Sequence, residues 1–263
     1  MSTRKEIIND FYSQYDEDTR TTRSRHGQLE YATTMAYIHR YAKKGSKVLE
    51  LGAGTGRYSI ALAQEGMDVT AVELTEANLA VLRKRGEGVA HLRIVPADAT
   101  DLSRFPDDAF DITLSLGPMY HLYESEEVNR AIDEAIRVTK PGGVILFAFL
   151  SAFAIMYSNY VYGETWKRGQ EMNFTKEGRP LHFKEQLFTG YDIVEFEGLF
   201  KDKPVEWIAT VGTDGMLEPL KHRPDFALSD EDFQAFVEWH LLFAEKRELL
   251  GATNHLLYVC KKR

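Results

Sequence analysis

The stretch Lys47–Gly56, with the sequence KVLELGAGTG, constrains the fold of this chain more than any other feature. Val48, Leu49 and Leu51 form a short apolar run that predicts a buried strand. Glycines follow at every second position, and the segment after them, 58–63, predicts the start of a helix. A strand, a glycine-rich turn and a helix present backbone N–H groups to a ligand at the carboxyl end of the strand. This turn is therefore the predicted cofactor site.

Four more apolar runs, at 68–73, 91–95, 109–116 and 144–150, predict strands that alternate with helical segments. The helices are predicted at 76–85 and 125–138, and a turn at 137–143. Such repeated strand–helix–strand units build a parallel sheet with helices on both faces. Two later runs, 205–212 and 255–260, complete a doubly wound, seven-stranded, mostly parallel α/β sheet whose last strand is antiparallel.

The two ends of the chain are predicted to hold the substrate. Helices are expected at 3–15 and 28–43, with a polar loop between them, and Gly45 is expected to end the second helix. This segment either packs on the sheet edge or folds over the cofactor as a lid, and the candidate lid contacts are Tyr12, Tyr15, Arg23, Arg25 and His26.

An aromatic-rich segment at 151–188 predicts a cap inserted after the fifth strand. Its aromatic side chains either form the small core of the cap or line a pocket for an apolar small molecule. Helices are then expected at 191–200 and from Ser229, as N-cap, to Leu250. His39, His240 and His255 fall in helix or strand patterns and are predicted to be structural.

Composition narrows the classes of partner. The net charge of −8 argues against a nucleic-acid surface, which needs clustered Lys and Arg. Cys260 is the single cysteine, so no internal disulfide is available, and a cytoplasmic location is expected. No stretch approaches the roughly 20 apolar residues of a membrane span, and 1–30 lack the apolar core of a secretory signal. No metal-ligand spacing is visible, so no metal site is predicted.

A set of motifs across 46–150 resembles the class I S-adenosylmethionine-dependent methyltransferases. The glycine pattern is G-x-G-x-G preceded by Glu50, whereas a dinucleotide-binding turn has G-x-G-x-x-G. Glu73 ends the second strand, about 20 residues further on, where an acidic side chain can accept hydrogen bonds from ribose hydroxyls. Asp98-Ala99, Phe110-Asp111 and RVTKPGG at 137–143 complete the set.

The resemblance implies a Rossmann-like domain with S-adenosylmethionine as cofactor and a role for each matching position. The glycine turn would meet the methionine part, Glu50 its ammonium group, Glu73 and Leu74 the ribose and adenine, and Asp98 and Ala99 the adenine edge. Leu116 and Gly117 would lie beside the methionine moiety and the reactive methyl group. The implied cofactor-binding residues are Glu50, Gly52, Ala53, Gly54, Gly56, Glu73, Leu74, Asp98, Ala99, Leu116 and Gly117.

Methyl transfer from a sulfonium requires mainly that the acceptor is aligned and that bulk water is excluded from the site. A general base is needed only if the acceptor atom is protonated. The segment after the fourth strand reads Gly117-Pro118-Met119-Tyr120-His121, not the Asn/Asp-Pro-Pro-aromatic sequence frequent in methyltransferases that act on nucleic-acid bases. His121 is a candidate general base, or a histidine that caps the next helix or bonds to backbone. Tyr120 is the second candidate catalytic residue, and it is a better candidate for a wall of the cofactor or substrate site than for an acid.

The prediction is a single methyltransferase domain over 1–263, made of an N-terminal helical segment (1–45), a cofactor-binding core (46–150), a cap (151–190) and a C-terminal completion of the sheet (191–263). The predicted acceptor is a small molecule. The alternatives are an RNA or protein methyltransferase, a nicotinamide-dependent oxidoreductase, and a non-catalytic cofactor-binding protein. The acceptor atom and the oligomeric state are not predicted.

Overall fold

The computed structural model describes residues 3–14, 23–161, 163–220, 223 and 225–263. Tyr15 and most of the predicted loop at 16–27 lie outside these residues. Two helices, α1 (Arg4–Tyr12) and α2 (Arg25–Tyr41), precede the first strand. Helix α2 begins three residues earlier than predicted, because the Ser24 side chain accepts a hydrogen bond from the Gly27 N–H and caps the helix there.

Seven strands form the main sheet in the order β3-β2-β1-β4-β5-β8-β7, which confirms the predicted doubly wound architecture. The strands β1 (Lys47–Leu51), β2 (Asp68–Glu73), β3 (Leu92–Pro96), β4 (Phe110–Ser115) and β5 (Thr139–Ser151) are parallel. Strand β8 (His255–Lys262) runs antiparallel between β5 and β7 (Val205–Gly212). A two-residue strand, β6 (Gly190–Tyr191), pairs with the end of β5 and was not predicted.

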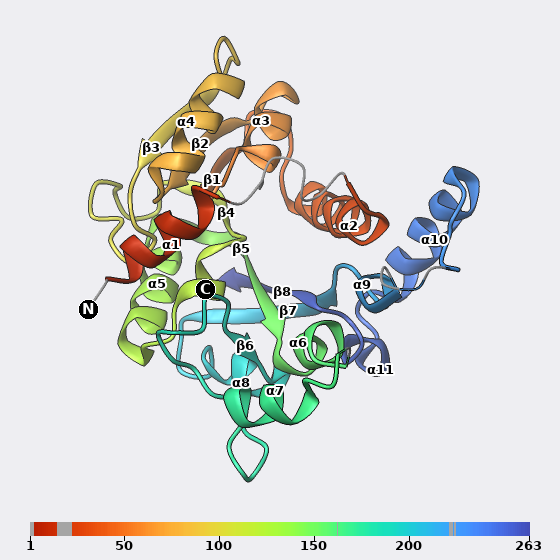
Figure 1. Cartoon of the computed structure of the whole chain (residues 1–263). Helices are drawn as coiled ribbons and strands as arrows, with labels where there is room; N and C mark the ends of the chain where they lie inside the picture. The colour runs from red at the N-terminus through yellow and green to blue at the C-terminus, as the bar shows by residue number, and fades with distance from the viewer. Residues whose placement is uncertain (1–2, 15–22, 162, 221–222, 224) are drawn as a thin grey trace.

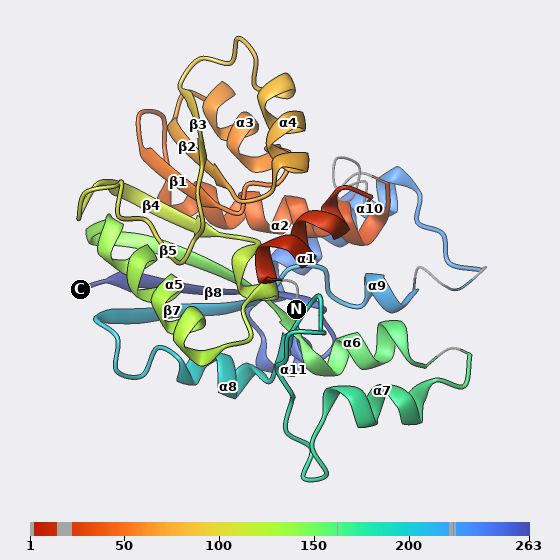
Figure 2. The ribbon, with the colours of Figure 1, turned by 60° about the vertical axis from the view of Figure 1, so that its left-hand side comes forward.

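Alternate residues of β5 face two different hydrophobic layers. Ile145, Phe147 and Phe149 pack in one layer with α5 (Ser125–Val138) and α8 (Ile193–Gly198). Leu146 and Ala148 pack in the other layer with α2 and α3 (Arg57–Gln64). Side chains alternate across a strand, so a continuous apolar run such as 144–150 is what a strand covered on both faces requires. Helix α4 (Glu76–Arg85) lies beside α3 in Figures 1 and 2.

Two predicted boundaries are wrong. The segment 137–143 is not a separate turn: α5 ends at Val138 and β5 begins at Thr139, but the register shifts between Phe110 and Ile112, with Gly142 at φ +77°, and regular pairing resumes at Val144. The predicted helix from Ser229 to Leu250 is divided into α10 (Asp230–Phe243) and α11 (Arg247–Leu250). The Ala244 carbonyl accepts from the Gly212 N–H, so the end of β7 takes an acceptor that a continuous helix would use.

The cap begins directly after β5. Helix α6 (Ala152–Asn159) is capped by the Ser151 side chain, and α6 and α7 (Trp166–Asn173) stand together beyond the end of β5 (Figure 2). Short helices η1 (Pro118–His121) and α9 (Leu217–Leu220) follow β4 and β7. Among the described helices, none combines the length and the apolar character needed to cross a membrane.

Candidate functional site

A cavity of about 900 Å³ opens at the carboxyl ends of the parallel strands. Its wall runs from the glycine turn after β1, past the ends of β2, β3 and β4, to the first residues of β8. The cap contributes Ile155, Tyr160 and Phe188, and α1 contributes Arg4, Ile8 and Tyr12. Ligands of open α/β sheets bind in the crevice outside the carboxyl ends of the strands, so the fold places a binding site here.

The glycine turn has the backbone that only glycine adopts easily. Gly52 and Gly56 have φ angles of +70° and +86°. A Cβ atom on Gly52 would lie 2.8 Å from the Pro118 Cδ atom, so Gly52 is required where the turn approaches η1. A Cβ atom on Gly56 would lie 2.2 Å from the Leu82 Cδ1 atom of α4. Gly56 is not part of the cavity wall, and its role in this structure is the packing of α4.

Glu73 is held rigidly at the end of β2. One carboxylate oxygen accepts a hydrogen bond from the Gly54 N–H at 2.8 Å, and the other accepts from the backbone N–H and the hydroxyl of Thr75, both at 2.8 Å. The side chain is 4% exposed and lies in the cavity wall. A fixed carboxylate with an acceptor site left on the Gly54-bonded oxygen fits the predicted contact with a ribose.

Glu50 lies deeper than Glu73 and accepts a hydrogen bond from the Ser59 hydroxyl. Burial raises the pKa of Glu50 to about 8, the Ser59 hydrogen bonds oppose this shift, and the charge of Glu73 adds to it. The carboxyl group is therefore mainly protonated at neutral pH in the absence of a ligand. An ammonium group placed beside it would favour the carboxylate, which suits the predicted contact with the amino group of the cofactor.

The carboxyl group of Asp98 is bonded to the N-terminal helix. It accepts from the Thr100 N–H at 3.0 Å, from the Thr100 hydroxyl at 2.9 Å and from Arg4 Nη2 at 2.6 Å. Arg4 Nε also lies 3.3 Å from Glu127 of α5. Figure 1 shows α1 between α4 and α5, so the first helix is anchored across the adenine end of the predicted site. Of the predicted lid contacts, Tyr12, Arg23 and His26 line the cavity, whereas Arg25 bonds Asp230 at 2.6 Å outside it.

Both ring nitrogens of His121 are engaged. Nδ1 lies 2.7 Å from the Leu187 carbonyl, so it donates there, and Nε2 then accepts from the Tyr12 hydroxyl at 3.1 Å. Burial lowers the pKa of His121 to about 4, which keeps the ring neutral. His121 thus ties α1 to the segment before β6, and this geometry favours the backbone-bonded interpretation over the general base. Tyr120 lies in the cavity wall, as do the remaining predicted positions Ala53, Leu74, Ala99, Leu116 and Gly117.

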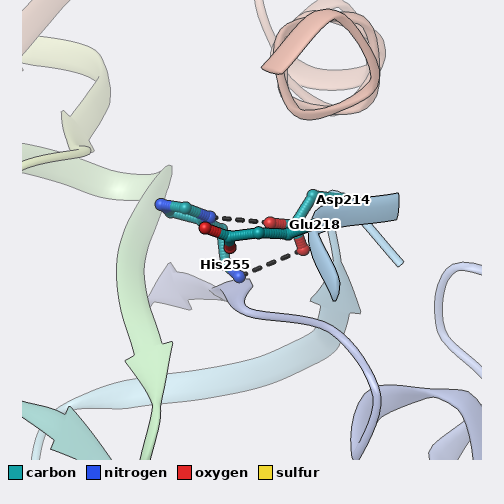
Figure 3. Close-up of side chains that lie close together, drawn as sticks. All are labelled: Asp214, Glu218 and His255. Carbon is teal, nitrogen blue, oxygen red and sulfur yellow. Dashed lines mark hydrogen bonds and ion pairs between the residues drawn. The ribbon is translucent and has the colours of Figure 1, made fainter. Parts of the chain in front are cut away.

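Three polar residues that the sequence did not assign to a site line the far end of the cavity: Glu218, Asn254 and His255. His255 Nδ1 lies 2.7 Å from Asp214 Oδ2 (Figure 3), and its ring lies 6.1 Å from the Tyr120 ring. His255 was predicted to be structural because it starts an apolar strand. Strand β8 is antiparallel, so its first residue lies opposite Leu150 at the end of the sheet where the parallel strands finish. The expected antiparallel direction of the last strand could therefore have predicted that His255 lies at the cavity end of the sheet.

The same cluster offers one potential ligand atom from each of Asp214, Glu218 and His255, all within 4.8 Å of one another. Both Asp214 carboxylate oxygens, one Glu218 oxygen and His255 Nδ1 already take part in hydrogen bonds. Asp214 Oδ1 accepts from the Thr253 hydroxyl at 2.7 Å and from the Asn254 N–H at 2.9 Å, and the Asn254 amide donates to Glu218. The cluster is therefore stable in this form as a hydrogen-bonded network.

Known proteins match the part of the chain that carries the motifs. Residues 49–147 match the methyltransferase domain family. A demethylmenaquinone methyltransferase from Clavibacter sepedonicus is 44% identical over 108 residues, which are 41% of this chain and 42% of that protein. A ubiquinone biosynthesis O-methyltransferase from Paramagnetospirillum magneticum is 31% identical over 153 residues, which are 55% of this chain and 58% of that protein. The chain spans about half the length of the curated relatives it matches.

Solved structures share the fold over most of the chain. An S-adenosylmethionine-dependent methyltransferase from Thermotoga maritima has a TM-score of 0.64 at 17% identity and covers 99% of this chain and 100% of its own. One from Methanosarcina mazei has a TM-score of 0.56 at 17% identity and covers 86% and 96%. Residues 49–147 match a methyltransferase domain, and the chain has the Rossmann-like fold of S-adenosylmethionine-dependent methyltransferases. These findings support the expected class I family and S-adenosylmethionine as its cofactor.

Proposed function

We propose that this protein transfers the methyl group of S-adenosylmethionine to a nucleophilic atom of a small-molecule acceptor. The observation that carries the proposal is that one cavity joins the predicted cofactor residues to a second, aromatic end formed by the cap and by the start of β8. Its volume of about 900 Å³ is near the upper end of the roughly 300–1,000 Å³ usual for ligand pockets, which leaves room for two ligands.

The residues of the cavity fit this cofactor. Glu50 would face the ammonium group, the glycine turn would meet the methionine part, Glu73 would hold the ribose, and Asp98 would face the adenine. When bound, the cofactor supplies a methyl group that is already activated by its sulfonium. The chain itself would align the acceptor and exclude bulk water, which is where α1 and the cap act.

Under this proposal, 1–263 work as one domain, with 1–45 as a cover over the cofactor and 151–190 as a cap over the acceptor. Arg4, Ile8 and Tyr12 support the first role, because each lies in the cavity wall. Tyr160 and Phe188 of the cap support the second role. Quinone-pathway methyltransferases among the relatives support an acceptor with an aromatic ring.

A methyl-transfer assay tests the proposal. The full chain is incubated with S-adenosylmethionine and separate panels of phenols, quinols and amines, and the release of S-adenosylhomocysteine is measured. Turnover is expected with members of at least one panel, at a rate that depends on acceptor concentration. Tight binding of S-adenosylhomocysteine without transfer to any panel member would instead favour a non-catalytic cofactor-binding protein.

A further inference from the structure

The end of the cavity opposite the glycine turn holds a histidine in an arrangement suited to proton transfer. His255 is the first residue of β8, and Asp214 lies in the bend that follows β7. His255 Nδ1 lies 2.7 Å from Asp214 Oδ2, and the His255 backbone N–H donates to Asp214 Oδ1 at 3.2 Å. These two contacts, both drawn in Figure 3, fix the orientation of the imidazole relative to Asp214.

The second ring nitrogen, Nε2, is at the far end of the ring, away from Asp214 (Figure 3). Among the residues that the structure describes, none forms a hydrogen bond with Nε2, and Nε2 is not sealed from solvent. His255 is one of the residues that line the cavity, and Nε2 is the ring nitrogen that Asp214 leaves for a ligand. A base whose other nitrogen is held by a carboxylate, with the reactive nitrogen facing a ligand cavity, has the geometry of an oriented general base.

The position of His255 is on the acceptor side of the cavity. Its ring is 6.1 Å from the ring of Tyr120, in η1. That helix directly follows Leu116 and Gly117, which the family resemblance implies to lie beside the reactive methyl group. His121, the base candidate from the sequence, has both nitrogens engaged, whereas His255 keeps one for a ligand.

We propose that His255, positioned by Asp214, is the group that removes the proton of the methyl acceptor. This role rests on the proposed methyl transfer. The acceptor atom forms a bond to the methyl carbon while the carbon–sulfur bond breaks and its electron pair stays on sulfur. The proton of the acceptor atom moves to His255 Nε2, and the resulting imidazolium is stabilised by Asp214 until the proton leaves to solvent. Asp214 is a positioning residue, because it acts through His255.

The surrounding charges set the strength of this base. The groups that face the ring are Glu30 of α2, Asp214, Glu218 of α9, and Tyr120 of η1. Burial alone would lower the pKa of His255, but the Glu30 and Asp214 carboxylates outweigh it and raise the pKa to about 9. At neutral pH the ring is therefore mainly imidazolium, and the fraction of His255 that can accept a proton increases toward pH 9.

The first test measures the histidine directly, in the chain 1–263 with S-adenosylhomocysteine bound. The ring signals of ¹³C-labelled histidine are followed by NMR against pH, and the signal of His255 is assigned with His255→Gln. His255 is expected to titrate near pH 9, and its titration in Asp214→Asn is expected to move down by at least one pH unit. A titration of His255 that is the same in Asp214→Asn and in the wild type would overturn the pairing of Asp214 with His255 on which the proposal depends.

The second test compares methyl transfer by His255→Gln with that by His39→Gln, a matched change at a histidine that pairs with Glu65 outside the cavity. His255→Gln is expected to lower kcat by about 10²- to 10⁴-fold, with the dissociation constant of S-adenosylhomocysteine within threefold of wild type. The wild-type rate is expected to rise from pH 7 to about 9, and this rise is lost in the variant. Phenol and amine acceptors are assayed separately to tell the two classes apart.

Three outcomes decide between the claims. A wild type that transfers the methyl group while His255→Gln does so at a similar rate and with the same pH profile overturns the role of His255 alone. A wild type that binds no S-adenosylhomocysteine overturns the proposed function and this role with it. Loss of wild-type activity in a chelator, restored by added Mg²⁺ or Zn²⁺, overturns the base role in favour of a metal held by Asp214, Glu218 and His255.

Discussion

Replacing Glu73 tests the cofactor end of the site most sharply, because its carboxylate makes three defined hydrogen bonds at 2.8 Å. In Glu73→Gln the amide oxygen can still accept from Thr75, but the amide nitrogen would face the Gly54 N–H, donor against donor. The variant also replaces the charged acceptor of a ribose hydroxyl by a neutral group. A hydrogen bond to a charged group contributes about 1.5–3 kcal/mol, so a loss of about 2 kcal/mol is expected.

That loss corresponds to a roughly 30-fold weaker dissociation constant for S-adenosylhomocysteine, measured by isothermal titration calorimetry. Glu73→Ala, which removes the whole carboxylate, should weaken binding by about 3 kcal/mol, or roughly 150-fold. Glu76→Gln is the matched control, because Glu76 follows closely in the chain, pairs with Arg83 and lies outside the cavity wall. Affinity of Glu73→Gln within threefold of wild type, with unchanged thermal unfolding of the free protein, would refute the contact between Glu73 and the ribose.

Three further changes follow from other contacts. Burial raises the pKa of Glu50 to about 8, whereas a ligand ammonium favours the carboxylate, so binding of S-adenosylhomocysteine should release a proton and tighten up to about tenfold per pH unit between pH 6 and 7.5. Calorimetry in buffers of different ionisation enthalpy measures the proton release, and Glu50→Gln should abolish both the release and the pH dependence. Gly56→Ala should destabilise the fold by about 2–5 kcal/mol in urea unfolding. The control Gly45→Ala should cost only about 1–2 kcal/mol, because Gly45 has a similar φ angle but a Cβ atom there would have no neighbour within 4 Å. Equal losses in the two variants would contradict the packing role of Gly56 against α4. Tyr12→Phe, which removes the hydrogen bond to His121, should cost about 1 kcal/mol of stability and raise proteolysis within α1, whereas unchanged protection of α1 would contradict its anchoring role.

The sequence predicts the cofactor half of the site because that half is local. The parallel strands β1 to β5 all end at the same edge of the sheet. Gly52, Glu73 and Asp98 follow or end such strands, so strand order alone predicts that they lie at this edge. The acceptor half is not local. His255, Asp214 and Glu30 come from three separate elements that meet only in the folded chain, and an apolar strand such as 255–262 gives no sign that its first residue faces a cavity.

The same difference explains His121 and Arg4. Whether His121 is free to act as a base depends on Leu187 and Tyr12, which are 66 and 109 residues away in the chain. Arg4 was not predicted at all, because its partners Asp98 and Glu127 belong to distant parts of the core. Element boundaries failed where a single backbone contact decides them, as the bond between Gly212 and Ala244 does at the end of α10.

The central claim is that the cavity at the glycine turn holds S-adenosylmethionine, and titration of the full chain with S-adenosylhomocysteine beside NAD and NADP tests it most directly. The account predicts saturable one-to-one binding of S-adenosylhomocysteine with a clear rise in the unfolding temperature, and no such effect of the two nicotinamide cofactors. Stabilisation by NAD or NADP alone would contradict it.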